Sequence, residues 1–313
     1  MNCSIIIRAY NEEKYIGRLL EGIRQQTIKD VEIILVDSGS TDSTVSIAES
    51  YGAKVVHIPS AEFTFGRSLN FGVKSAAREF IVIASAHVYP VYPDWLETLL
   101  RPFQDEQVAL AYGKQRGYEG SKYSEHQIFH QWYPDVSNFD QPTAFCNNAN
   151  AAIRKSLWAL HPYDETLTGL EDLEWGKWAK GQGYKIAYVA EAEIVHIHNE
   201  TPRGVYNRYR REAMAFKKIY SESHFSIYDF LRLTFTNVLS DLWHAVRERA
   251  LLKSLASIFW FRFMQFHGTR IGHRETSLVT PQLRETFYYP RERKPGDKSK
   301  RDVEPIRYND GNE

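Results

Sequence analysis

Apolar residues recur along the first part of the chain in a pattern that alternates between strand and helix. The segment Cys3-Ser4-Ile5-Ile6-Ile7 is typical of a buried strand, and apolar residues at the spacing of one helix face follow it: Ile16, Leu19, Leu20 and Ile23. Further strands are expected at 31–36, 54–58 and 80–84, with a helical segment after each of the first two. This alternation, with its short connections, predicts an α/β fold whose mostly parallel sheet is covered by helices on both faces.

Beyond residue 84 the alternation becomes less regular. A helix is expected from Asp94 and a strand at 108–112. Residues 117–142 are rich in Tyr, His, Asp and Gln without periodicity, which predicts an irregular loop, and a loop of that length inside a compact domain is usually functional or mobile. The remaining elements are a strand at 145–153, a helix at 171–180 and two short strands at 186–189 and 194–197.

The last third of the chain has a helical pattern from Arg203 to about Gly268. The residues after it become charged and poor in apolar side chains, which is typical of disorder. Three parts are therefore expected. They are an α/β domain over 1–202, a helical extension over 203–289 and a charged, disordered tail over 290–313.

Composition narrows the class of protein. Of 313 residues, 39 are Lys or Arg and 39 are Asp or Glu, so the formal net charge is zero, and this argues against a nucleic-acid binder. Two cysteines without metal-site spacing favour a reducing, cytoplasmic setting. The longest late apolar run, 254–261, is too short to span a bilayer, and we expect no transmembrane helix and no cleavable leader.

Small and polar residues follow the expected strands at the edge where open α/β sheets bind ligands. Ser85-Ala86-His87 ends the fourth strand, and Asp37 and Asp42 bracket a turn after the second. Taken alone, the two aspartates serve equally well to cap the following helix.

Four segments in sequence order give a more specific signal. They are Tyr10-Asn11-Glu12, the segment from Val36 to Asp42, Gly66-Arg67-Ser68-Leu69-Asn70, and Leu170-Glu171-Asp172. Together they resemble the family-2 glycosyltransferases of the GT-A fold, and the resemblance runs from about residue 4 to residue 198. It implies a bacterial enzyme for polysaccharides or lipid-linked oligosaccharides, built as a GT-A domain over 1–202.

The resemblance implies roles for residues at two places. The nucleotide would be held by Tyr10, Glu12 and Asp37, and Arg67 and Asn70 would lie near the sugar or phosphates. Neighbours in the same turns complete the expected donor site: Ala9, Asn11, Ser38, Gly39, Ser85, Ala86 and His87. Asp172 matches the general base, Glu171 is the neighbouring candidate, and the displacement would invert the anomeric carbon. A helix N-terminus favours a negative charge, so Asp172 is expected to stay ionised.

One motif departs from the family pattern. Where the family has Asp-x-Asp, this chain has Ser85-Ala86-His87, so a hard cation lacks its carboxylate ligands. Three alternatives remain open. His87 with His196 or His198 binds a borderline metal; basic side chains replace the metal, with Arg67, Lys74, Arg154 and Arg203 as candidates; or the donor carries a single phosphate, as in a CMP-activated sugar. Whether Mn²⁺ or Mg²⁺ is needed is left open.

The function expected from the resemblance is transfer of a sugar from a nucleotide-sugar donor to a hydroxyl of a surface-polysaccharide or lipid-linked glycan acceptor. The irregular segment 117–142 is then expected to form a lid or wall on the acceptor side. The basic segment 203–218 suits the inner surface of a membrane, and a solvated face or a homodimer contact fits it equally well. One rival is a non-catalytic glycan-binding scaffold. A sugar-nucleotide pyrophosphorylase is disfavoured, because Arg8-Ala9-Tyr10-Asn11-Glu12-Glu13 contains no glycine.

Overall fold

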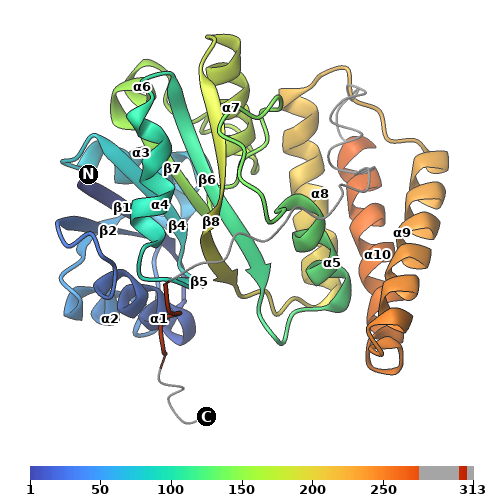
Figure 1. Cartoon of the computed structure of the whole chain (residues 1–313). Coiled ribbons are helices and arrows are strands. Elements are labelled where there is room, and N and C mark those ends of the chain that lie inside the picture. The colour runs from blue at the N-terminus through green and yellow to red at the C-terminus, as the bar shows by residue number, and fades with distance from the viewer. Residues whose placement is uncertain (275–302, 309–313) are drawn as a thin grey trace.

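A computed structural model describes residues 1–274 and 303–308. Its centre is an eight-stranded sheet in the order β3-β2-β1-β4-β7-β6-β8-β5 (Figure 1). The strands are β1 (Cys3–Ala9), β2 (Val31–Asp37), β3 (Lys54–His57), β4 (Phe80–Ser85), β5 (Val88–Pro90), β6 (Val108–Gly117), β7 (Asn150–Arg154) and β8 (Lys185–His196). Neighbours are parallel except at β7 and β5, so the expected mostly parallel α/β fold is confirmed.

Helices cover both faces of the sheet. One face packs against α1 (Glu13–Arg24), α2 (Thr44–Ser50) and α4 (Trp95–Leu100), and the other against α3 (Phe65–Ser75), α6 (Lys155–Leu160) and α7 (Glu171–Gly181). Strand β1 shows the reason, because Ile5 and Ile7 enter the first core while Ile6 enters the second. Side chains alternate along a strand, so an unbroken apolar run requires cover on both sides.

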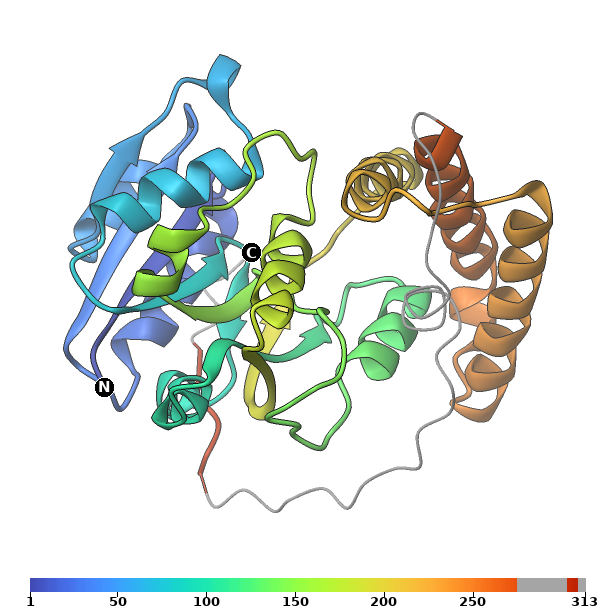
Figure 2. The ribbon, with the colours of Figure 1, turned by 90° about the horizontal axis from the view of Figure 1, so that it is seen from above.

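Three long helices form the extension beside the sheet (Figure 2). They are α8 (Pro202–Ile219), α9 (Ile227–Arg247) and α10 (Leu251–Arg274), and α10 packs against both of the others. Inside this packing Arg262 donates two hydrogen bonds to Asp241, of 2.7 and 2.8 Å, and both side chains are buried. The extension thus has a polar anchor within its apolar core.

Four expectations about local structure were wrong. The segment 117–142 is not a continuous loop, because it contains α5 (Tyr123–Trp132), whose buried face includes the polar residues Ser124 and Glu125 and so hides its periodicity. The strand expected at 145–153 begins only at residue 150. The two short strands near the end of the domain are one strand, β8, and the last helix continues to residue 274.

The expected tail over 290–313 falls mostly outside the described residues. Residues 303–308 are described, and there the N–H of Ile306 donates to the carbonyl of Val91, while the Tyr308 hydroxyl donates to the carbonyl of Pro90. Disorder was therefore wrong for this short piece. Among the described helices, none combines the length and apolar character needed to cross a bilayer.

Candidate active site

The carboxyl ends of three parallel strands lie level with one another. In the sheet register Ala9 pairs with Asp37, and Arg8 pairs with both Val36 and Ser85. The structure thus brings together the ends of β1, β2 and β4, where the donor site was expected. Ala86 follows β4 and is buried in the core.

The Asp37 carboxylate accepts most of its hydrogen bonds from its own turn. It is buried and accepts hydrogen bonds from the backbone N–H groups of Gly39 (3.0 Å) and Ser40 (3.2 Å). Gly39 has a φ of 96°, which a side chain would disfavour. The Ser38 hydroxyl donates to the carbonyl of Ala9 and ties β2 to β1. These bonds hold the turn rigidly at the sheet edge.

The loop after β1 is joined to the same turn. The Asn11 side chain, on a residue with a φ of 55°, accepts from the N–H of Thr41 (2.8 Å), and the Asn11 N–H donates to the Ser40 hydroxyl (2.9 Å). Tyr10 is exposed next to them. The Glu12 carboxylate instead accepts from Nδ1 of His87 at 2.9 Å. Glu12 therefore faces the end of β4.

The two predicted donor residues on α3 are differently placed. Asn70 is buried, and its amide bonds to the backbone of Tyr163, to Trp158 and to Glu165, so its hydrogen-bonding capacity is used within the protein. Its expected contact with sugar or phosphate finds no support there. Arg67 pairs with Glu62 at 2.6 Å near the surface and would have to exchange that partner to bind a phosphate.

Two acids open α7 and are both buried. Leu170, with a φ of 57°, turns the chain into the helix. The Glu171 carboxylate accepts from Arg8 at 3.0 Å, and from the side chain of Asn148 at 3.3 Å. The Asp172 carboxylate accepts from the backbone N–H groups of Asn148 (2.9 Å) and Leu173 (2.8 Å). Arg8, at the end of β1, thus connects the donor edge to these acids.

Burial changes the proton affinity of Asp172. Burial, and next the neighbouring Glu171 carboxylate, raise its pKa from 3.8 to about 7, although the two N–H groups act in the opposite direction. The expectation that the helix N-terminus keeps Asp172 firmly ionised was therefore wrong, because the loss of water outweighs the helix effect. A carboxylate with a pKa near neutral is well suited to accept a proton in a reaction.

Three histidines gather beside the end of β4. Pairing of β5 with β8 places Val88 opposite His196, and the N–H of Ile197 donates to the carbonyl of His87. Each of His87, His196 and His198 offers a possible ligand atom, and these atoms all lie within 4.8 Å of one another. Burial lowers the pKa of His196 and of His198 well below the usual value, and the nearby positive charge of Arg208 acts in the same direction.

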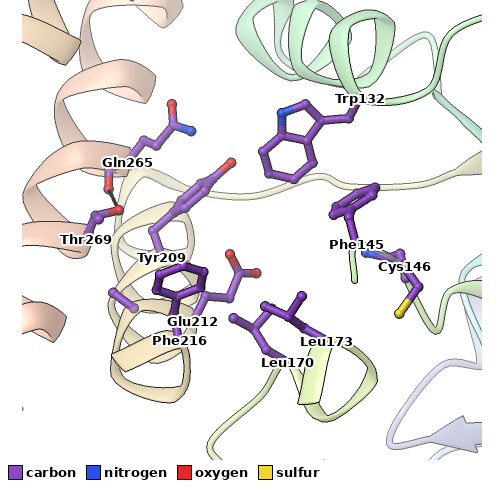
Figure 3. A pocket seen from close by; sticks show the side chains of 12 residues that line it. Trp132, Phe145, Cys146, Leu170, Leu173, Tyr209, Glu212, Phe216, Gln265 and Thr269 are labelled. Atoms are coloured by element: carbon purple, nitrogen blue, oxygen red, sulfur yellow. Dashed lines mark hydrogen bonds between the residues drawn. The ribbon is translucent and has the colours of Figure 1, made fainter. Parts of the chain in front are cut away.

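A pocket opens between the α/β domain and the extension (Figure 3). Its volume is about 630 Å³, including the part open to solvent. Leu170 and Leu173, on either side of the two acids in sequence, form one wall. Aromatic and polar side chains form the rest, among them Trp132, Phe145, Tyr209, Glu212, Phe216, Gln265 and Thr269. Burial raises the pKa of Glu212.

Sequence reasoning missed several residues of this site. Arg8 and Asn148 hold the acids, but neither lies in a recognisable motif. Tyr209 and Glu212 come from α8, which was interpreted as a basic membrane-facing or solvated segment. The available signal was that aromatic residues and one acid, Glu212, lie among the basic residues of this segment.

Comparison with known proteins decides the family. The model of "Glycosyl transferase family 2" matches residues 4–160. This chain belongs to glycosyl transferase family 2. The O-antigen chain rhamnosyltransferase RfbN of Salmonella typhimurium is 30% identical over 222 residues, covering 67% of this chain and 70% of that protein. The O-antigen chain rhamnosyltransferase WbaN of Salmonella anatum is 31% identical over 198 residues, covering 59% of this chain and 62% of WbaN.

Solved structures agree on the fold. A mannosyltransferase from Pyrobaculum calidifontis, in complex with GDP-Man and Mn²⁺, has a TM-score of 0.58 at 18% identity and covers 86% of this chain and 85% of its own. Staphylococcus aureus TarS 1–349 has a TM-score of 0.53 at 19% identity, and the match covers 88% of this chain and 91% of the TarS chain. The expected family and the expected GT-A-like fold are therefore confirmed. As a member of glycosyl transferase family 2, the chain is an inverting enzyme.

Proposed function

We propose that this glycosyltransferase moves a rhamnosyl residue from a nucleotide-activated donor to a hydroxyl of an O-antigen-type, lipid-linked glycan. The names of its Salmonella relatives support the sugar and the glycan. The observation that carries the catalytic assignment is the burial of Asp172, with a pKa of about 7, next in sequence to Leu173 of the pocket wall. Its neighbour Glu171 forms a salt bridge with Arg8 at the donor edge.

The proposed reaction assigns one role to each acid. The Asp172 carboxylate removes the proton of the acceptor hydroxyl, whose oxygen attacks the anomeric carbon from the face opposite the leaving group. The bond from that carbon to the phosphate oxygen breaks, and its electron pair leaves with the nucleotide. Glu171 holds Arg8 in place and raises the pKa of Asp172. Such proton transfer typically contributes about 10²- to 10⁴-fold to the rate.

The pocket between α7, α8 and α10 is the proposed acceptor site. Trp132 and Tyr209 offer ring faces for a sugar, and Glu212, Gln265 and Thr269 offer groups that bond to hydroxyls. The acceptor-side role expected for 117–142 is thereby proposed for its helix α5, which contributes Trp132. The donor is proposed to bind across the ends of β1, β2 and β4, with Tyr10 and Asp37 beside the base and ribose.

A transfer assay tests this proposal. Purified enzyme is incubated with a lipid-linked oligosaccharide acceptor and, in turn, rhamnose activated with dTDP, UDP or GDP, and a CMP-activated sugar. We expect one rhamnosyl donor to give product, Asp172→Asn to abolish transfer, and the matched control Asp30→Asn, at the amino edge of the sheet, to leave the rate unchanged. Nucleotide binding by calorimetry should survive Asp172→Asn. Absence of turnover with every donor would favour the scaffold alternative.

The outer face of the extension supports a membrane location. Exposed apolar side chains follow α9 and α10 at helical spacing, namely Leu231, Phe235, Leu239, Trp243, Val246, Leu252, Leu255, Phe259 and Phe263. Basic residues lie among them, and the guanidinium of Arg247 lies over the Trp243 ring. We propose that this face lies on an anionic bilayer surface, because apolar and aromatic side chains with interspersed cations match that interface.

Vesicle flotation tests the membrane location. We expect binding to vesicles that contain phosphatidylglycerol, weaker binding to neutral phosphatidylcholine vesicles, and loss of binding when Leu239 and Trp243 are both replaced by serine. Leu160→Ser is the matched control, because Leu160 is equally apolar and 72% exposed but lies on α6. A stable dimer in light scattering that the double substitution dissociates, without vesicle binding, would assign the face to a second copy instead.

A further inference from the structure

Three imidazoles at the donor edge come from two chain segments that the sheet brings together. His87 lies between β4 and β5, while His196 ends β8 and His198 follows two residues later. Their rings are close, with centroids 5.1 Å apart for His87 and His196 and 4.0 Å apart for His196 and His198. The candidate ligand atoms of all three fall within 4.8 Å.

In each ring Nδ1 has an oxygen partner on another element. His87 contacts Glu12 at 2.9 Å, His196 contacts the Gln115 amide oxygen at 2.8 Å, and His198 contacts Glu125 at 2.7 Å. A carboxylate or an amide oxygen accepts a hydrogen bond, so the contacts of His87 and His196 place the proton of each of these rings on Nδ1. Nε2 of these two rings then carries the lone pair. Nδ1 of His198 also lies 3.0 Å from the guanidinium of Arg208, which can only donate and pairs with the same Glu125, so its two contacts do not assign the His198 proton to one nitrogen.

One nitrogen in this group lacks the partner that its burial requires. Nε2 of His196 is buried and has no hydrogen bond within the described part of the chain, and His196 is only 6% exposed. Buried polar atoms are nearly always paired, because losing water without a replacement partner is costly.

We propose that His87, His196 and His198 bind one divalent transition metal of the zinc and cobalt class, through Nε2 of His87 and of His196 and through one ring nitrogen of His198. Metal-bound histidines commonly donate their other nitrogen to a carboxylate or carbonyl group, and the rings of His87 and His196 do so here. Three nitrogen ligands favour Zn²⁺, Co²⁺ or Ni²⁺ over Mg²⁺, which prefers oxygen. The site differs from a pair of carboxylates in ligand type and in metal preference.

The link to catalysis rests on the proposed function. A divalent ion next to the end of β4 would offset negative charge on a departing phosphate. Metal binding itself requires neither donor nor acceptor. The two proposals can therefore fail separately.

Metal titration of the untagged full chain is the direct test. Protein stripped with EDTA and desalted is titrated with Co²⁺ and followed by visible absorption, and competition with Zn²⁺, Mn²⁺ and Mg²⁺ gives the order of affinity. We expect one equivalent of Co²⁺ with a spectrum of nitrogen coordination, displacement by Zn²⁺, and no displacement by equimolar Mg²⁺. A spectrum without nitrogen ligands, or Mg²⁺ binding as tightly as Zn²⁺, would overturn the proposal.

Substitutions locate the site on these three rings. His87→Ala should weaken Co²⁺ binding more than about 100-fold, and Glu12→Ala, which removes only the partner of His87, by about 10- to 100-fold. The control is His130→Ala, because His130 is exposed on α5. Circular dichroism verifies that each variant is folded. If a histidine variant fails to fold, the Co²⁺ affinity of the Glu12→Ala protein tests the assignment instead. Unchanged Co²⁺ affinity in folded His87→Ala or Glu12→Ala protein would refute the assignment.

Discussion

Replacing Asp172 by asparagine should change the pH dependence of stability in a defined direction. Burial and the neighbouring Glu171 raise the pKa of Asp172 from 3.8 to about 7, so the folded protein favours the protonated form. Stability from this group is fully present below about pH 4 and is lost as the pH rises to about 7, above which the loss is complete. A pKa shift of one unit corresponds to about 1.4 kcal/mol, so the shift from 3.8 to about 7 lowers the unfolding free energy by about 4 kcal/mol at high pH.

Asparagine carries no charge at any pH, so it removes this loss. It also has one oxygen where aspartate has two, and one of the N–H groups of Asn148 and Leu173 loses its acceptor, at a cost of about 1–3 kcal/mol that does not vary with pH. By pH 5 the wild type has already lost about 1.6 kcal/mol through the raised pKa of Asp172, which is similar to this cost. Asp172→Asn should therefore be about as stable as the wild type at pH 5 and should gain on it up to about pH 7, above which the difference levels off.

Urea unfolding of both proteins at half-unit steps from pH 5 to pH 8 measures this change. The difference in unfolding free energy should change by about 2–3 kcal/mol over that range, and the wild-type kcat should rise with pH through about 7 as the base loses its proton. A constant difference across the range would refute the raised pKa. Glu171→Gln is the second comparison. It removes the neighbouring charge, so in this variant the pKa of Asp172 should fall and the pH-dependent loss of stability should end at a lower pH.

Three further substitutions test separate parts of the structure. Arg8→Met leaves Glu171 buried without its cation, and urea unfolding should show a loss of about 3 kcal/mol; a loss below 1 kcal/mol would contradict the pairing. Trp132→Ala removes a ring face of the acceptor pocket and should raise the acceptor KM about tenfold with donor KM unchanged; the reverse effect would place the ring on the donor side. Asp241→Ala leaves Arg262 buried and unpaired, and the melting temperature should fall by several degrees, corresponding to about 3 kcal/mol; an unchanged melting temperature would show that the pair does not stabilise the extension.

The regular part of the fold could be predicted because local periodicity and global packing agree there. β1 is apolar on both faces and α1 on one, so the pattern determines the layers. Prediction failed where polar residues are buried. The inward face of α5 includes Ser124 and Glu125, and the partners of the Glu125 carboxylate, His198 and Arg208, lie on distant elements, so no local pattern distinguishes this helix from a loop.

The candidate site could be predicted only in part for the same reason. The strand ends and Asp172 lie in contiguous motifs, and the sheet register does bring the strand ends together. Asn70 lies in such a motif as well, yet it is satisfied inside the core. Its neighbours in space, Trp158 and Tyr163, are far away in sequence. A motif identifies a residue, but the packing of distant segments decides its partners.

The Arg208–Glu125 pair has a consequence for how this enzyme could be recombined with its relatives. Arg208 belongs to α8 and Glu125 to α5, and both contact His198. A chimera joined at the boundary of 202 and 203 would import a foreign α8 and leave Glu125 without its cation at the donor edge. Exchange of acceptor specificity by swapping the helical extension should therefore preserve donor chemistry only when the incoming helix carries an arginine at the position of Arg208.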